Sequence, residues 1–181
     1  IALVGNTARS DWSVALYQTK GKDMIISHNT GTTSPMTGGT LYEYQNIDEA
    51  TVKGVEIAYN FDFTDTFFLN TSFSKMKTDD GEDGKLPFRP KTLAKIKLTK
   101  EFSHNFMLAV SANHTGKSYD GDDNVDSYTL YDAVVNKAVN DNVSLQLAVN
   151  NITGEKLDKD SDNHMTELLG REVKVSFNLN F

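Results

Sequence analysis

Acidic side chains gather in three segments, and one of them has the spacing of a calcium-binding loop. The segment DKDSDNHMTE places Asp158, Asp160 and Asp162 at its first, third and fifth positions, which supply ligands in such loops. Asn163 stands at the sixth position, where a calcium loop has glycine, and Leu169 at the twelfth, where it has an acid. Asp158, Asp160 and Asp162 are therefore candidate metal ligands, and a solvated acidic loop is the alternative.

The other two acidic segments, at 79–83 and 120–126, raise the same two alternatives. Serine, histidine and aspartate residues are common in the connecting segments, but no G-x-S-x-G motif marks a nucleophile. The chain has no cysteine, which excludes thiolate catalysis, thiolate metal sites and disulfides. We therefore predict no catalytic residue, no cofactor and no enzymatic activity.

Charge and composition narrow the class of protein. The net charge of −7 lacks the basic footprint of a nucleic-acid-binding protein. No apolar run reaches the length of a transmembrane helix. Hydrophobic residues make up 38% of the chain, which is low for a domain with a two-sided core. A barrel with a hydrated interior needs fewer apolar residues, so the composition favours one.

The residues that could do chemistry stand between segments that alternate apolar and polar side chains. The last segment is the most regular, since Val173, Val175, Phe177, Leu179 and Phe181 share one parity. Successive side chains of a strand point to opposite faces, so this segment has one apolar and one polar face. The apolar face could meet the core of a soluble sandwich or the lipid around a barrel.

Period-two alternation recurs along the chain, and no amphipathic helix interrupts it. A bulge is expected near Asp132. We predict nine strands, at 1–4, 12–26, 42–63, 67–77, 92–102, 106–119, 128–139, 143–151 and 169–181.

The connections between these strands sort by length. Short turns (GNTARS, TDT, SHN, NDN) alternate with long segments (SHNTGTTSPMTGG, TDDGEDGKLPFRP, DGDDNVDS, TGEKLDKDSDNHMTE). A meander with all short turns at one end of the strands produces this order, and a Greek-key sandwich has no reason to. Outer-membrane barrels have short periplasmic turns and long outer loops. The sorting therefore predicts an all-β, antiparallel, up-and-down transmembrane β-barrel.

A series of motifs resembles the C-terminal half of TonB-dependent outer-membrane receptors of the siderophore type. In order, they are YEYQNIDEATVKGVEIAYNF (Asn46, Ala50, Lys53, Gly54, Val55, Glu56), LPFRPKT (Pro87, Arg89, Pro90), SYTLYDA (Tyr128, Asp132), LAVNNITGEKL (Asn150, Asn151) and LLGREVKVSFNLNF (Gly170, Arg171, Phe181). The order and spacing of these motifs carry the resemblance more than any one of them.

The resemblance implies that residues 1–181 are the C-terminal segment of a barrel of about 22 strands. It also implies a separate N-terminal plug domain, absent from this sequence, that carries the contact with TonB. The expected location is the outer membrane of a Gram-negative bacterium, where lipopolysaccharide surrounds the barrel. Val173, Val175, Phe177, Leu179 and Phe181 resemble the C-terminal signal that barrels present to the assembly machinery.

The resemblance further implies import of a scarce small ligand, most simply a ferric siderophore. Candidate ligand-binding residues in the outer loops are His28, Arg89, Tyr119, His164 and Arg171. The histidines could contact an iron complex, and the arginines suit an anionic ligand. The alternative for the histidines is ordinary polar surface, and for the arginines it is pairing with loop acids. The alternative for Tyr119 is a place in an aromatic girdle.

Two other functions remain open at this point. Small outer-membrane barrels of this length include lipases and acyltransferases. A soluble β-sandwich binding protein would use the same alternation, with a core between two sheets.

Overall fold

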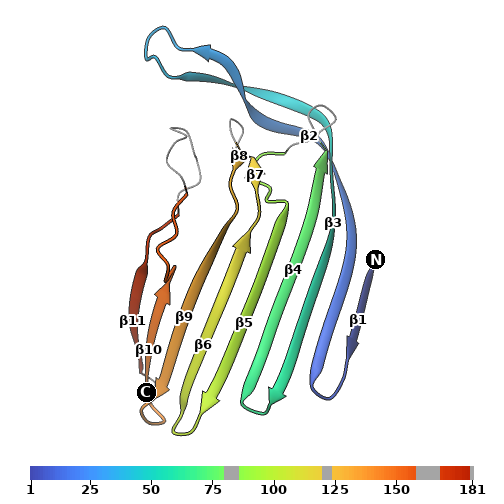
Figure 1. Cartoon of the computed structure of the whole chain (residues 1–181). Helices are drawn as coiled ribbons and strands as arrows, with labels where there is room; N and C mark the ends of the chain where they lie inside the picture. The colour runs from blue at the N-terminus through green and yellow to red at the C-terminus, as the bar shows by residue number, and fades with distance from the viewer. Residues whose placement is uncertain (80–85, 120–123, 158–167, 180–181) are drawn as a thin grey trace.

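In the computed structural model, we describe residues 1–79, 86–119, 124–157 and 168–179. Nine strands form one antiparallel sheet in the order β1-β2-β3-β4-β5-β6-β9-β10-β11 (Figure 1). They are β1 (Ala2–Asn6), β2 (Ser10–Thr33), β3 (Thr40–Thr64), β4 (Phe67–Asp79), β5 (Thr92–Phe102), β6 (Phe106–Thr115), β9 (Tyr128–Ala138), β10 (Val143–Asn150) and β11 (Glu172–Leu179). The short strands β7 (Ser118–Tyr119) and β8 (Asn124–Val125) pair separately. The nine predicted strands are confirmed.

Each strand pairs with its neighbour along the sheet, so the sheet is an up-and-down meander and a partial barrel. The four short turns lie at one end and the four longer connections at the other (Figure 1). Among the described residues we found no helix long and apolar enough to cross a lipid bilayer. The predicted sorting of connections by length is confirmed.

The short turns are closed by local chemistry. His104 and Asn105 have φ of 65° and 57°, a left-handed conformation that histidine and asparagine adopt more readily than most residues. The Asn140 side chain accepts hydrogen bonds from the backbone N–H of Asn142 and of Val143, both at 2.9 Å. These turns fix the register of the strands that they join.

Two local predictions were wrong. The segment 27–39 was expected to be a long loop, but β2 continues to Thr33 and β3 begins at Thr40. Pairs such as Ser27↔Tyr44 extend the β2–β3 hairpin, which bends over the top of the sheet in Figure 1. The bulge expected near Asp132 is absent, because the register of β9 with β6 runs without a shift through Ser111↔Asp132.

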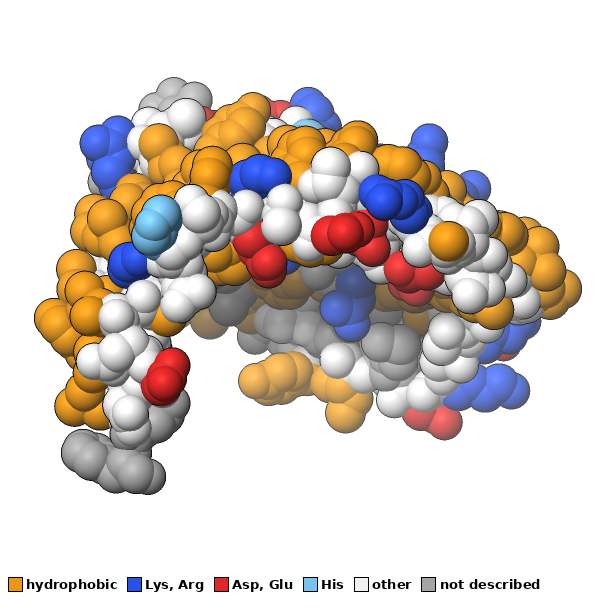
Figure 2. All heavy atoms as spheres, turned by 90° about the horizontal axis from the view of Figure 1, so that it is seen from below, with side chains coloured by type: hydrophobic (Ala, Val, Ile, Leu, Met, Phe, Trp, Pro, Cys, Tyr) orange, Lys and Arg blue, Asp and Glu red, His pale blue; other side chains and the backbone are white. Residues whose placement is uncertain are grey.

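The two faces of the sheet differ in chemistry. Register partners such as Val14↔Ile57, Ile57↔Phe73 and Leu147↔Val175 place apolar side chains on one face. Figure 2 shows this face as the convex side of an arc. Its side chains are exposed, Val175 by 65% and Phe177 by 70%, so the convex face needs an apolar environment outside the protein.

The sheet encloses no hydrophobic core between layers. Only small or isolated hydrophobic residues are buried in the part of the chain that we describe: Ala50, Leu86, Ala109, Val125 and Ala148. A second sheet packed on the first would bury many large side chains. The sandwich alternative is therefore wrong.

Aromatic rings gather on the convex face near the short turns. Phe61 and Phe63 meet edge to face with centroids 5.0 Å apart, and Phe63 stacks on Phe67 at 4.8 Å. Phe102 and Phe106 pair across the next turn at 5.5 Å. An aromatic belt at this level is typical of the interface between lipid and water.

Candidate functional site

Polar side chains cover the concave face. One row runs across six strands through the register partners Asp11, Asn60, Asn70, Lys97, Ser111 and Asp132. Asn60 Nδ2 donates to Asp11 Oδ1 at 2.9 Å, and Asn70 Nδ2 donates to Asn60 Oδ1 at 2.8 Å. This row is the arrangement expected of the wall of a hydrated lumen.

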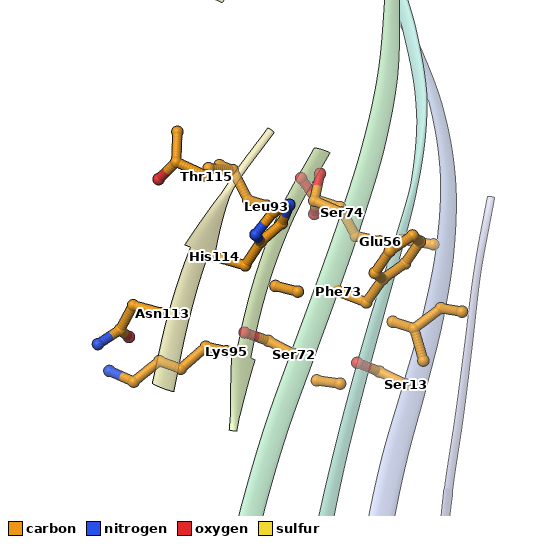
Figure 3. Close-up of a pocket in the computed structure, with 14 residues that line it drawn as sticks. Ser13, Glu56, Ser72, Phe73, Ser74, Leu93, Lys95, Asn113, His114 and Thr115 are labelled. Carbon is orange, nitrogen blue, oxygen red and sulfur yellow. The ribbon is translucent and has the colours of Figure 1, made fainter. Parts of the chain in front are cut away.

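A hollow of about 420 Å³ lies on this face where β2 to β6 meet (Figure 3). Its floor is shallow because its side chains are small: Ser13, Ala15, Ala58, Ser72 and Ser74. Glu56, Lys95 and Asn113 stand around it, and Figure 3 shows Ser13, Ser72 and Lys95 pointing to the same side. The hollow can receive a polar protein surface or a small polar ligand.

Two features limit the chemistry of the concave face. The Ser74 hydroxyl at the hollow is buried and has no hydrogen-bond partner among the described residues. Within those same residues, no group of three or more His, Asp or Glu side chains could hold a metal ion. The polar side chains of the described surface suit hydrogen bonding and charge pairing.

At the long-loop end, two connections are tied into one unit. The backbone N–H of Phe88 donates to the carbonyl of Tyr119 at 2.7 Å, and that of Lys91 to the carbonyl of Lys117 at 3.0 Å. Lys117 also pairs with Asp126 at 2.8 Å. The hydrogen bond and charge of Lys117 lower the pKa of the Asp126 carboxyl, and Asp126 in turn raises the pKa of Lys117.

A second unit centres on Asp132 and Asn151. The Asp132 carboxylate accepts from Asn113 Nδ2 at 2.8 Å and from the backbone N–H of Asn151 at 2.9 Å. Asn151 is 3% exposed, and its Nδ2 donates to the carbonyls of Glu155 and Leu169, both at 2.9 Å. These contacts hold both ends of the β10–β11 connection against the top of β9.

The structure brings two of the predicted ligand-binding residues together. Arg89 is exposed in the connection after Leu86, and Tyr119 lies in β7 on the connection that is bonded to it. The backbone of His28 lies in β2, opposite Glu43 of β3, so His28 belongs to the hairpin and not to a loop. Arg171 is exposed, and its Nε donates to the carbonyl of Ile152 at 2.8 Å.

Several predicted residues fall outside the described part of the chain. These are His164, the candidate metal ligands Asp158, Asp160 and Asp162, and Phe181 of the terminal signal. Val173, Val175, Phe177 and Leu179 lie in β11 on the convex face.

The residues that organise the long-loop end were missed as a site. The sequence pointed to Asp132 only through the motif SYTLYDA and as the place of a bulge, and to Asn151 only through the motif LAVNNITGEKL. Asn151 carried a signal in the sequence, since an asparagine just after a strand often bonds nearby backbone groups. Asp132 lies inside β9 and carried no such signal. Their partners could not be read from the sequence, because 19 residues separate the two.

A comparison with family models decides the family. Residues 1–152 match the model for the TonB dependent receptor-like β-barrel. The chain belongs to this family. TonB-dependent receptors are outer-membrane transporters and not enzymes, so the alternative of a barrel enzyme is excluded.

Curated relatives agree with the family. The chain is 31% identical to the vitamin B12 transporter BtuB of Photobacterium profundum over 156 residues, covering 84% of this chain and 25% of the relative. It is 25% identical to the probable TonB-dependent siderophore receptor PiuA of Acinetobacter baumannii over 160 residues, covering 76% and 22%. The chain thus spans about a quarter of the length of these relatives.

Solved structures of TonB-dependent receptors share the fold. The copper transporter OprC superposes with a TM-score of 0.82 at 16% identity, over 99% of this chain and 30% of that one. The siderophore receptor PiuA from Acinetobacter baumannii gives 0.69 at 22% identity, over 94% and 26%. These likenesses concern the fold of the barrel wall.

Proposed function

We propose that the chain is the C-terminal part of the barrel of a TonB-dependent receptor that imports a scarce small ligand across the outer membrane. A ferric siderophore is the favoured ligand, and vitamin B12 is the second candidate because one relative bears that name. The observation that carries the proposal is the separation of an exposed apolar convex face from a polar concave face within one meander.

The domain organisation is part of the proposal. The edges β1 and β11 pair with further strands of the same receptor and close the wall, because a membrane does not tolerate bare sheet edges. A plug domain N-terminal to this segment fills the lumen and contacts TonB. The hollow, the charged side chains around it and the Ser74 hydroxyl are the described surface on which such a plug would pack.

The ligand meets the long-loop end of the wall. Arg89 and Tyr119 are held on two bonded connections, where a guanidinium can bind an anionic ligand and a phenol can donate to it. His28 lies in the β2–β3 hairpin and Arg171 lies just before β11, so both are apart from Arg89 and Tyr119 along the chain. His164 is added to the proposal from the sequence alone. The apolar residues of β11, followed by Phe181, act as the signal for barrel assembly.

Uptake by the full-length receptor tests the proposal. We expect cells that express it to accumulate ⁵⁵Fe-siderophore or ⁵⁷Co-cyanocobalamin only when TonB is present. Arg89→Ala should weaken ligand binding at the cell surface by roughly tenfold, the effect of losing one charge-assisted hydrogen bond. Lys97→Ala, on the concave wall outside the hollow, is the matched loss of one cation. Uptake that does not depend on TonB, or equal binding by the Arg89 and Lys97 variants, would contradict these assignments.

A further inference from the structure

Lysines cluster on the convex face just above its apolar band, on the long-loop side. Lys53 of β3 stands directly opposite Lys77 of β4, and Lys75 lies opposite Val55. Val55 is register partner to Leu16 in the apolar set, so these three lysines share the convex face. Lys20 and Lys22 continue the same parity on β2. We call Lys53, Lys75 and Lys77 the upper lysine cluster.

The upper lysine cluster is unfavourable in the protein alone. Like charges directly opposite each other in a sheet destabilise the pair. Lys53, Lys75 and Lys77 are all exposed, and none has an ion pair within the described residues. Nearby, Glu49 is already bonded to Lys20 at 2.6 Å. Asp79 of β4, opposite Thr51, lies next to Lys77 on the same face, and its single charge balances at most one of the three lysines. The cluster therefore keeps a net positive charge within the described residues.

Lysines at the opposite rim of the convex face are arranged differently. Lys100 donates to Thr66 Oγ1 at 2.8 Å and lies over the ring of Phe67 at 5.9 Å. The ammonium of Lys137 donates to the backbone carbonyl of His104. Each of these lysines is satisfied by the adjacent short turn. A lysine at the edge of the apolar band can therefore find a partner within the protein, as Lys100 and Lys137 do.

An occupant of the cluster must be both anionic and apolar. Val55 and Phe73 lie two residues below the lysines on the same face, and both belong to the apolar band. A soluble anion would meet only the ammonium groups, and a soluble acidic protein would meet exposed apolar side chains. A lipid with a phosphorylated headgroup meets both, its acyl chains against the band and its phosphate among the lysines.

We propose that Lys53, Lys75 and Lys77 form a binding site for the phosphate groups of the outer-leaflet glycolipid, lipopolysaccharide. This inference rests on the proposed outer-membrane location. The bound lipid would lie against β3 and β4, which form one sector of the barrel wall. Bound phosphate would also relieve the repulsion between Lys53 and Lys77.

The experiment uses the full-length receptor in a zwitterionic detergent and diphosphorylated lipid A as the probe. Native mass spectrometry counts bound lipid over a titration. Replacing all three lysines by glutamine should lower the affinity on the order of 100-fold, about fivefold for each lysine near a charged surface. The control replaces Lys95, Lys97 and Lys174 on the concave face by glutamine, with the same change in net charge. It should bind as the wild type does.

Two further measurements keep the test decisive. The single variant Lys77→Gln should lose about fivefold, which covers the case in which the triple variant fails to fold. Dephosphorylated lipid A should bind the wild type as weakly as the diphosphorylated lipid binds the triple variant. Equal binding by the triple variant and the wild type, or equal loss in the concave control, would overturn the site. TonB-dependent uptake is scored separately, so a receptor that imports normally without selective lipid binding overturns this inference alone.

Discussion

The convex and concave faces are made by the same strands, yet they are stabilised in opposite ways. Ile96 and Leu147 of the convex face are exposed by 46% and 44%, so much of their apolar surface faces outward from the protein. The concave face carries side-chain hydrogen bonds such as Asn60 to Asp11 and Asn113 to Asp132. One face depends on what surrounds the protein, and the other depends on contacts within it.

This difference predicts that a charge is tolerated on one face only. Ile96→Arg places a guanidinium in the middle of the convex band, between Thr71 and Ala112. We expect it to cost about 2–4 kcal/mol of folding free energy, the value for a cation near the bilayer midplane. Urea unfolding of the full-length receptor in phosphatidylcholine vesicles measures it.

The matched change is Ser176→Arg, which adds the same charge to the concave face away from the hollow, opposite Gln146. We expect a change within about 0.5 kcal/mol, because this part of the concave face is polar and lines the hydrated lumen. If the two variants lost equal stability in vesicles, the convex face would not be the lipid-facing one.

A second prediction concerns close packing on the concave face. The Tyr17 side chain lies over Gly54, and a Cβ added at Gly54 would stand 2.5 Å from Tyr17 Oη. Gly54→Ala must displace the ring, and we expect it to lose about 1–3 kcal/mol in urea unfolding. Gly39→Ala, where the nearest atom is Thr37 Oγ1 at 3.6 Å, is the control without a clash.

A double-mutant cycle separates the clash from other effects of alanine. In a Tyr17→Ala background, Gly54→Ala should lose far less stability than in the wild type. An unchanged loss in that background would show that the ring of Tyr17 does not restrict Gly54. A similar close contact lies on the convex face, where the Trp12 side chain lies over Gly5. A Cβ added at Gly5 would stand 2.5 Å from Trp12 Cζ2.

The fold could be predicted well where one face of a strand is apolar and the other polar. Strands such as β5 and β10 alternate throughout and end at turn residues, so their bounds followed from the sequence. The outer part of the β2–β3 hairpin was missed, because Ser27 to Thr33 shows no apolar parity. Backbone pairing with Tyr42, Tyr44 and their neighbours holds it, and pairing between distant segments leaves no periodic signal.

The sequence predicted at which end of the sheet the candidate site lies, but not which of its residues come together. Arg89 and Tyr119 were expected at the outer end, but their proximity depends on the bonds between Phe88 and Tyr119 and between Lys91 and Lys117. These bonds join backbone groups, which carry no residue preference. The upper lysine cluster was equally hidden, since the register of β3 against β4 decides that Lys53 faces Lys77.

A third prediction concerns the Asp132 carboxylate, which bonds the Asn113 side chain and the Asn151 backbone where the concave face meets the long-loop end. Asp132→Ala leaves the Asn151 N–H and the Asn113 amide without their acceptor. We expect a loss of about 1–2 kcal/mol, with faster amide hydrogen exchange in 151–157 and 168–171. Asp11→Ala removes an acceptor near the short turns instead, and it should leave that exchange unchanged. Equal exchange in both variants would show that Asp132 does not hold the connection.

The smallest expected effect lies at the tip of the bonded connections, where neither face contributes. Lys117 lowers the pKa of Asp126, so this ion pair stabilises the folded state above the ordinary pKa of an aspartate and loses that contribution as the pH falls through the lowered value. Lys117→Gln should therefore speed hydrogen exchange in 116–119 and 124–126 slightly at neutral pH, and the difference from the wild type should vanish in acid. Because both side chains are exposed, high salt should also reduce the difference. A difference that persists below the lowered pKa would mean that Lys117 acts through packing and not through its charge.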